Sequence, residues 1–262
     1  LQDYARSGND ILALRYSYSY DEQQDFLLLS HDGGKTYEDV TPDLFKKQPS
    51  GWKKVLKSLV QHPADPSLLL VSSIPMGLFQ SSDYGQSWNQ LTDYIPDHTG
   101  YHPLNPEIIY ESGESDGYWP YIRVSYDGGQ TWSDVSPNYP GDNCVNRMAF
   151  HPTDPNKWIA GGFGSIYTTN DNAQSWNTQV LSGEHYALWR YVTYDNENSN
   201  IIYMVGGYPQ KDIKLMCSTN EGTSWNKPYS ELIDNTSITG VYDLKQYGDK
   251  LLIYTETAVY TV

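Results

Sequence analysis

Carboxylates are concentrated in a nine-residue segment that begins at Glu111 and reads Glu-Ser-Gly-Glu-Ser-Asp-Gly-Tyr-Trp. Two carboxyl groups about 5 to 10 Å apart across a glycosidic bond are the machinery of glycoside hydrolysis. Glu111, Glu114 and Asp116 could supply one of them, and Asp142 or Glu184 the other. Because the chain is acidic throughout, simple solvation at the surface is the competing interpretation of each carboxylate.

Aromatic rings and arginines recur in stretches that are expected to be loops. Flat rings stack on the C–H faces of sugars while neighbouring polar groups bond to the hydroxyls, so these side chains favour a glycan ligand. The candidate binding residues are Trp52, Tyr101, Tyr118, Trp119, Arg147, Tyr186, Trp189, Arg190 and Tyr208. Two alternatives stay open: several rings could pack in the interior, and Arg147, Trp189 and Arg190 could anchor a protein interface.

An eight-residue box of the form Ser/Thr-x-Asp-x-Gly-x-Ser/Thr-Trp recurs five times along the chain. A motif repeated in this way defines the scaffold, and the scaffold positions the loops that carry these groups. The copies start at Ser30, Ser81, Ser125, Thr169 and Ser218, in steps of 51, 44, 44 and 49 residues. Each follows a short apolar run, so the box is interpreted as a turn between two strands. Its Asp can accept backbone N–H groups, its Gly supplies a positive φ, and its aromatic residue is expected to lie between neighbouring sheets.

A second repeat, His-Pro-x-Asp/Asn-Pro, begins at His62, His102 and His151, and a degenerate copy lies near Asp195. Pro and Asp/Asn mark a tight turn, so these histidines are expected to be structural. We expect no metal site, since equivalent positions on successive repeats diverge in space.

The two repeats together predict a unit of four short antiparallel strands, which is a blade of a β-propeller. We therefore expect an all-β fold, a single six-bladed propeller domain over residues 1–262. The sixth blade would be incomplete or closed by the N-terminus. The expected blades are approximately 1–43, 44–95, 96–138, 139–182, 183–232 and 233–262. Ligands would bind at the mouth of the central channel, on the loops opposite the boxes.

These motifs resemble those of the Asp-box (BNR-repeat) propeller superfamily, which includes sialidases, xyloglucanases, sortilin and photosystem II assembly factors. The resemblance spans the chain and implies the fold, but those families have unrelated functions. The sialidase Arg-Ile-Pro motif is absent, because Tyr16-Ser17 follows Arg15, so sialidase activity is not expected. The xyloglucanase resemblance includes Gly77-Leu78-Phe79-Gln80, yet its catalytic-Asp motifs are not recognisable here.

Composition excludes some function classes. A formal charge of -15, from 32 acidic and 17 basic residues, repels nucleic acid. No apolar run approaches the roughly 18 residues that a membrane span needs. The acidic, Tyr-rich chain favours an extracellular, periplasmic or cell-surface setting, and its start at Leu1 suggests a processed protein or a domain of a longer one.

The sequence therefore predicts an extracellular carbohydrate-binding propeller, a monomer without a cofactor, whose partner is a glycan or polysaccharide. Whether it is an enzyme stays open. The alternatives are a small glycoside hydrolase that uses the carboxylates above and a protein-interaction or assembly scaffold.

Overall fold

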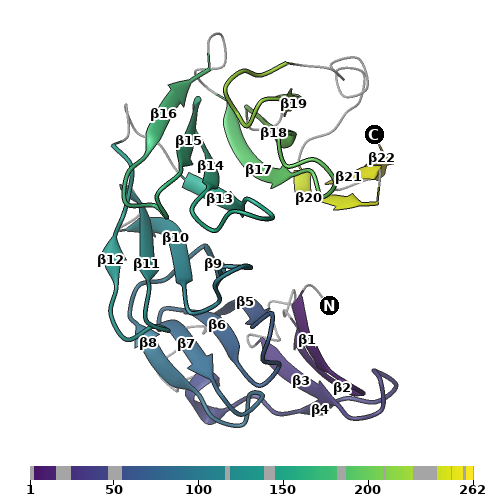
Figure 1. The fold of residues 1–262 in the computed structure, drawn as a ribbon. Helices are drawn as coiled ribbons and strands as arrows, with labels where there is room; N and C mark the ends of the chain where they lie inside the picture. Colours follow the sequence, from purple (N-terminus) through teal and green to yellow (C-terminus); the bar gives the residue numbers. More distant parts are fainter. Residues whose placement is uncertain are drawn as a thin grey trace. The chain divides into compact units, whose positions relative to one another are not determined.

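The computed structural model describes residues 3–15, 25–46, 55–115, 119–138, 145–181, 187–208, 211–226, 241–248, 250–255 and 258–261. These residues form six antiparallel sheets, one after another along the chain, and one short 3-10 helix, η1 (Asp43–Phe45) (Figure 1). The fold is an all-β, six-bladed propeller, which confirms the fold class that the two repeats predict.

The chain divides into two compact units. The first comprises residues 1–115 and 123–133, and the second comprises residues 116–122 and 134–262, so the division falls within blade three. The expectation of a single domain over residues 1–262 stays a prediction.

Blades one to three each contain four strands in sequence order. Blade one contains β1 (Asp3–Ser7), β2 (Asp10–Arg15), β3 (Phe26–Ser30) and β4 (Glu38–Asp39). Blade two contains β5 (Val55–Gln61), β6 (Leu69–Ile74), β7 (Gly77–Ser81) and β8 (Asn89–Thr92). Blade three contains β9 (His98–Tyr101), β10 (Ile109–Ser115), β11 (Trp119–Ser125) and β12 (Ser133–Asp134).

Blade four also has four strands, whereas blades five and six have three within the described residues. Blade four contains β13 (Val145–Phe150), β14 (Trp158–Gly162), β15 (Ser165–Thr169) and β16 (Asn177–Val180). Blade five contains β17 (Leu188–Tyr194), β18 (Ile202–Tyr208) and β19 (Lys211–Ser218), with a bridge from Cys217 to Asn226 where its fourth strand would start. Blade six contains β20 (Val241–Tyr247), β21 (Lys250–Thr255) and β22 (Val259–Thr261).

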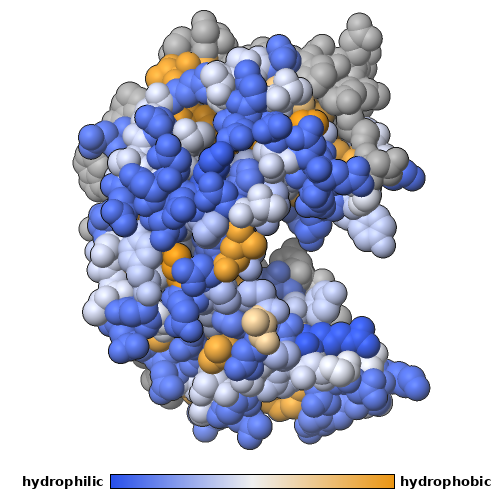
Figure 2. All heavy atoms as spheres, viewed as in Figure 1, coloured by the Kyte–Doolittle hydropathy of each residue, from blue (hydrophilic) through white to orange (hydrophobic). Residues whose placement is uncertain are grey.

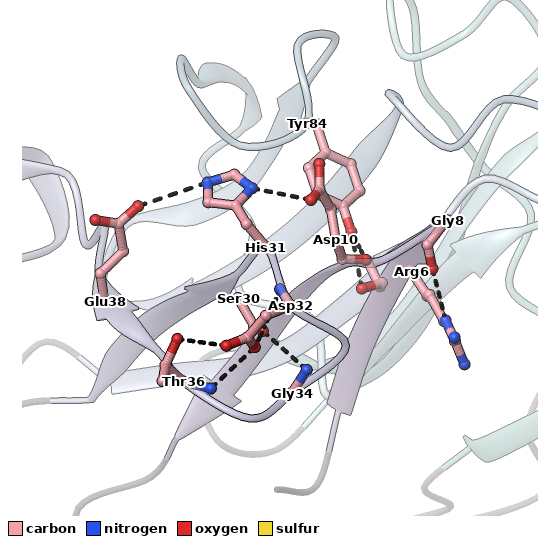
Figure 3. A network of polar contacts seen from close by, with 11 residues as sticks. Arg6, Gly8, Asp10, Ser30, His31, Asp32, Gly34, Thr36, Glu38 and Tyr84 are labelled. Carbon is pink, nitrogen blue, oxygen red and sulfur yellow. Dashed lines mark hydrogen bonds and ion pairs between the residues drawn. The ribbon is translucent and has the colours of Figure 1, made fainter.

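Each box closes its turn through its own side chains. In blade three, Ser125 Oγ donates to Asp127 Oδ1 (2.7 Å) and accepts from the Gly129 N–H (2.7 Å). The Asp127 carboxylate accepts from the N–H (2.8 Å) and from the hydroxyl (2.6 Å) of Thr131. Figure 3 shows the same arrangement around Asp32 in blade one. The box Asp therefore accepts backbone N–H groups, as predicted.

Two successive residues of every box adopt positive φ. In blade three they are Gly128 (69°) and Gly129 (95°), a conformation that side chains resist. The fourth box has Asn172 (62°) and Ala173 (65°) instead, so Ala173 holds a backbone conformation that the other four copies give to glycine. The predicted role of the box glycine is confirmed, and the residue before it shares that conformation.

The first of these two residues joins the box to the turn between the first and second strands of the same blade. Its N–H donates to a backbone carbonyl of that turn at 2.9 to 3.0 Å: Gly33 to Asn9, Tyr84 to Ser67, Gly128 to Glu107, Asn172 to Asn156 and Glu221 to Asn200. The repeat of this bond explains why the two sequence motifs stay in register.

The four box tryptophans contact neighbouring blades, as expected, whereas Tyr37 of the first box is 38% exposed. Trp88 packs edge-on against Phe45, with ring centroids 5.9 Å apart, in a core to which blades one and two both contribute. Its indole N–H donates to Gly85 O (3.1 Å), whereas that of Trp176 donates to Val135 O (2.7 Å) in the preceding blade.

A second tie joins blades one and two within the first unit. The Tyr84 hydroxyl lies 3.0 Å from the carbonyl oxygens of both Ala5 and Asp10 and can donate to either (Figure 3). In the same view, His31 Nδ1 bonds to the Asp10 carboxylate (2.9 Å) and Nε2 lies 3.6 Å from Glu38 Oε1. The hydrogen bond to Asp10 raises the pKa of His31 above its ordinary value.

The histidines of the second repeat are structural. His151 Nδ1 accepts the N–H groups of Thr153 (3.2 Å) and Asp154 (3.0 Å), and His62 and His102 do the same in their own turns. In blade five, Asp195 Oδ1 takes that place and accepts two N–H groups at 2.9 Å. The turn therefore requires a hydrogen-bond acceptor at this position, and either an imidazole or a carboxylate can supply it.

The N-terminus forms the first strand of blade one, where β1 pairs with β2 from Asp3 to Ser7. This finding corrects the alternative in which the N-terminus supplies the outer strand of blade six.

We predict that His151→Ala lowers the free energy of unfolding by about 1–3 kcal/mol, because it removes two hydrogen bonds that contribute about 0.5–1.5 kcal/mol each. His151→Asp should recover a large part of that loss, because Asp195 fills the same role in blade five. Urea denaturation of the two variants and the parent chain measures the difference. Equal losses for Ala and Asp would contradict the acceptor role.

The box carboxylates predict sensitivity to acid. Hydrogen bonds from Thr131 and Ser125 lower the pKa of Asp127 from 3.8 to about 2. Its stabilisation is therefore present above about pH 4 and is lost as the pH falls through about 2. Asp127→Asn should make the free energy of unfolding depend less on pH in this window, and Asn220→Asp, in the box that is naturally neutral, should make it depend more. Urea denaturation at pH 7, 4 and 2.5 is the measurement, and an unchanged pH dependence in both variants would rule this out.

Candidate functional site

The predicted catalytic carboxylate that the structure describes is an interior group. Glu111 lies on β10, is fully buried, and forms an ion pair with Arg123 on β11, with Oε1 2.7 Å from Nη1. Burial raises the pKa of Glu111 to about 7, although Arg123 opposes that shift, and no described residue forms a hydrogen bond with Oε2. The Glu114 side chain, Asp116, Asp142 and Glu184 lie outside the described residues.

The partner of Glu111 is held by two aromatic rings. The Arg123 guanidinium lies 4.0 Å from the ring centroid of Tyr94 and 5.4 Å from that of Trp132, and it donates to Thr92 Oγ1 (3.0 Å). The ion pair lies within blade three, and the contacts of Arg123 with Thr92 and Tyr94 join blade three to blade two. Glu111 therefore lies on a buried strand, a correction to the expectation that it belongs to a loop.

Two of the predicted ligand aromatics lie in the core. Tyr101 ends β9, packs edge-on against His62 with ring centroids 4.7 Å apart, and is 8% exposed. Trp189, on β17, is fully buried, and a Cβ at Gly161 or Gly206 would collide with its backbone. For these two, the interior-packing alternative holds. Trp52, Tyr118 and Tyr186, and the side chains of Trp119 and Tyr208, lie outside the described residues.

The remaining two candidates, Arg147 and Arg190, share a structural position. Each is the third residue of the first strand of its blade, and the pairing register shifts there, as it does at Lys57 in blade two. A β-bulge of this kind places an extra residue in one strand and re-aims a side chain. Arg190 is exposed, and Arg147 is partly exposed.

Arg147 belongs to a cluster built from the first strands of blades four, five and six, all within the second unit. Its guanidinium lies 4.6 Å from the ring centroid of Tyr191, on β17, and Nη1 is 3.3 Å from Asp243 Oδ1, on β20. Lys245 Nζ, also on β20, lies 2.9 Å from Asp243 Oδ2. We call these four residues the Arg147 cluster.

Sequence reasoning missed three members of this cluster: Tyr191, Asp243 and Lys245. The signal was present, because Asp243 is the third residue of β20, as Arg147 is of β13. Aligning the first strands of the blades, rather than searching the loops, would have brought these positions together.

The charges on the first strands differ from those of the whole chain. The six first strands, β1, β5, β9, β13, β17 and β20, carry Arg6, Lys57, Arg147, Arg190 and Lys245, against Asp3 and Asp243. The chain as a whole has 17 basic and 32 acidic residues, so cations are enriched on these strands. The face seen in Figure 2 is mostly hydrophilic, with apolar residues in small separate spots. These features favour polar recognition over apolar docking.

Among the described residues, no group of three or more His, Cys, Asp or Glu side chains is placed to hold a metal ion. No helix within the described ranges is long and apolar enough to cross a membrane.

Comparison with known proteins assigns the family. The family model for sortilin, neurotensin receptor 3 (Sortilin-Vps10) matches residues 121–257, just over half of the chain. The chain belongs to the Sortilin-Vps10 family. This result confirms the resemblance to the Asp-box propellers.

A curated relative and two solved structures extend the comparison. The photosystem II assembly lipoprotein Ycf48 of Synechococcus sp. (strain CC9902) is 25% identical over 140 residues, which cover 50% of this chain and 40% of that protein. The GH74 xyloglucanase from Xanthomonas campestris has a TM-score of 0.70 and 16% identity, and the match covers 99% of this chain and 44% of the enzyme. The structure of Ycf48 bound to D1 peptide has a TM-score of 0.67 and 13% identity, and the match covers 99% of this chain and 75% of Ycf48.

The two solved structures share the propeller fold with this chain, and at these identities they establish the fold alone. The chain spans less than half the length of the curated Ycf48 relative and of the xyloglucanase.

The Glu111–Arg123 pair predicts that stability falls as the pH rises from about 4.5 to about 7. The unfolded carboxyl releases its proton near its ordinary pKa of 4.5, whereas the folded one retains it to about 7, so ionisation costs the folded state about 3 kcal/mol over this window. Glu111→Gln should remove this slope from the free energy of unfolding measured in urea. Glu107→Gln, on the exposed turn before β10, is the control, and a slope retained in Glu111→Gln would refute the raised pKa.

Proposed function

We propose that this chain is a binding module that recognises a short acidic segment of a protein partner, and that the Arg147 cluster and Arg190 form its recognition surface. The observation that carries the proposal is the placement of cations at β-bulges on the first strands of an otherwise acidic chain. Arginine and lysine recognise carboxylates through charge-assisted hydrogen bonds, the stronger class of hydrogen bond in proteins.

The geometry of Arg147 supports this role. Its contact with the Tyr191 ring limits the orientations of the guanidinium, so less conformational entropy is lost when a ligand binds. The guanidinium carries five N–H donors, of which the bond to Asp243 uses Nη1. Lys245 and Arg190 are exposed on neighbouring strands of the same unit.

Net charge restricts the class of ligand. With a formal charge of -15, the chain repels a long polyanion, so a nucleic acid or an extended acidic tract is disfavoured. A segment with one or two carboxylates meets the local cations without a large cost from the overall field. This argument favours a peptide segment as the ligand.

The relatives support a protein partner. Ycf48 is described as a photosystem II assembly lipoprotein and has a structure with a D1 peptide, and the family model is named for a receptor, neurotensin receptor 3. We propose that this chain, like these relatives, is a propeller that binds a segment of another protein. We place the chain in an extracellular, periplasmic or cell-surface setting, in keeping with its acidic, Tyr-rich composition.

Glycan binding is the second candidate. The observation that favours it is Tyr94, a residue that is 42% exposed while the Arg123 guanidinium lies over its ring, so the exposed part of the side chain could stack on a sugar. The loop aromatics Trp52, Tyr118 and Tyr186 stay candidates from the sequence alone. A hydrolase would need Glu114 or Asp116 with Asp142 or Glu184, because Glu111 is committed to its ion pair.

The test is binding of fluorescent peptides that contain two glutamates, compared with the same peptides containing glutamines. We expect binding to the glutamate peptides that weakens as salt is raised, and about 10- to 100-fold weaker binding by Arg147→Ala, since a hydrogen bond to a charged group contributes about 1.5–3 kcal/mol. Lys250→Ala, which removes an exposed cation from β21, is the control and should bind as the parent does.

The same protein applied to a glycan array separates the candidates. Array binding that Tyr94→Ala removes and Arg147→Ala retains, with no preference for glutamate peptides, would replace the peptide proposal with the glycan one. Release of reducing ends that Glu114→Gln or Asp142→Asn abolishes would identify a hydrolase.

A further inference from the structure

Asp243 satisfies both cations of the Arg147 cluster from within the chain. Its Oδ1 accepts from Arg147 Nη1 (3.3 Å) and from the Leu244 N–H (3.0 Å), and its Oδ2 accepts from Lys245 Nζ (2.9 Å). One carboxylate of blade six therefore bonds to an arginine of blade four and to a lysine of its own strand. A single carboxylate thus engages both cations of the cluster.

The contact is accessible and weak enough to exchange. The side chains of Asp243, Arg147 and Lys245 are 24%, 41% and 65% exposed. The Arg147–Asp243 distance of 3.3 Å is long for a charge-assisted bond, which usually measures about 2.7–2.9 Å. Partly exposed ion pairs of this kind contribute little net stability.

We propose that Asp243 is an internal competitor: it occupies the place of a ligand carboxylate at Arg147 and Lys245, and a partner segment must displace it or bind against its charge. This inference rests on the proposed function of the Arg147 cluster. It assigns Asp243 as the residue that sets affinity and selectivity at this site, because a ligand with a single weak carboxylate gains little by the exchange.

The competing account is that Asp243 positions Arg147 for the ligand. The two accounts predict opposite effects of Asp243→Asn, which keeps an oxygen acceptor for Arg147 and the Leu244 N–H and removes the negative charge. A competitor that loses its charge no longer opposes the ligand, whereas a positioning residue that loses its charge releases the arginine.

The experiment measures binding of the same two-glutamate peptide by fluorescence anisotropy at low and moderate salt. For Asp243→Asn we expect about 5- to 10-fold tighter binding and a steeper decrease with salt, because one repulsive charge is gone. Asp195→Asn, a carboxylate of the His-Pro-type turn in the same unit, is the matched control and should not tighten binding. Binding that is unchanged or weaker in Asp243→Asn overturns the competitor role.

A second measurement needs no ligand. The hydrogen bond from Lys245 to Asp243, with the attraction between their charges, raises the pKa of Lys245. The rate at which an amine-directed acylating reagent labels Lys245 at pH 9 should therefore increase in Asp243→Asn, while labelling of Lys250 stays constant. An unchanged rate shows that the pair does not form in solution, and it overturns the proposal even if the parent chain binds peptide.

The two failures are distinguishable. Peptide binding by the parent chain with no gain in Asp243→Asn overturns the competitor role and retains the proposed function. Faster labelling of Lys245 with no peptide binding by any variant overturns the proposed function, and with it the competitor role, and leaves the pair as a structural contact.

Discussion

The structure depends on a backbone constraint in the Asp box: two successive residues in the left-handed conformation, held by a Ser/Thr hydroxyl and a carboxylate. This conformation turns an N–H toward the neighbouring turn of the same blade, where a carbonyl accepts it in all five copies. The hydrogen bonds inside the box offset the conformational cost at residues such as Ala173, which lacks the freedom of glycine. The two turns on one side of each of these five blades are thereby fixed to each other.

Because the turns on one side of a blade fix its strands, the side chains on its first strand can differ from blade to blade. The bulges at Lys57, Arg147 and Arg190 occur near the starts of these strands, far along the chain from the boxes. A bulge interrupts the ladder locally without disturbing the rest of the sheet, because the following pairs return to regular register. The side chains at these positions can therefore change while the propeller scaffold stays the same. The related propellers include a receptor, an assembly lipoprotein and a xyloglucanase.

Much of the fold could be predicted from the sequence because its determinants are local. The Ser125 hydroxyl bonds to Asp127 and to the Gly129 N–H, both within four positions, so the spacing of these residues in the sequence determines the geometry of the turn. The histidine turns were predicted to be structural for the same reason, and Asp195 shows what the position requires. Of the two alternatives for blade six, the one in which the N-terminus supplies its outer strand was wrong, because β1 pairs locally with β2 through the hairpin at Gly8.

The candidate site was harder to predict because it depends on contacts between distant residues. Glu111 looked like a loop carboxylate, but it pairs with Arg123 across two strands, and Trp189 looked like a loop aromatic, but small glycines on neighbouring strands accommodate it in the core. Asp243 meets Arg147 from 96 positions away, a contact that composition and spacing do not reveal. The one related feature of the sequence is that Arg147 and Asp243 are each the third residue of the first strand of their blades.

The most direct test of the account is a crystal structure of the chain with a glutamate-containing peptide bound. The account predicts a peptide carboxylate within hydrogen-bond distance of the Arg147 guanidinium, with the Asp243 side chain turned away from it. A peptide seated elsewhere, with the bond between Arg147 and Asp243 intact, would contradict it.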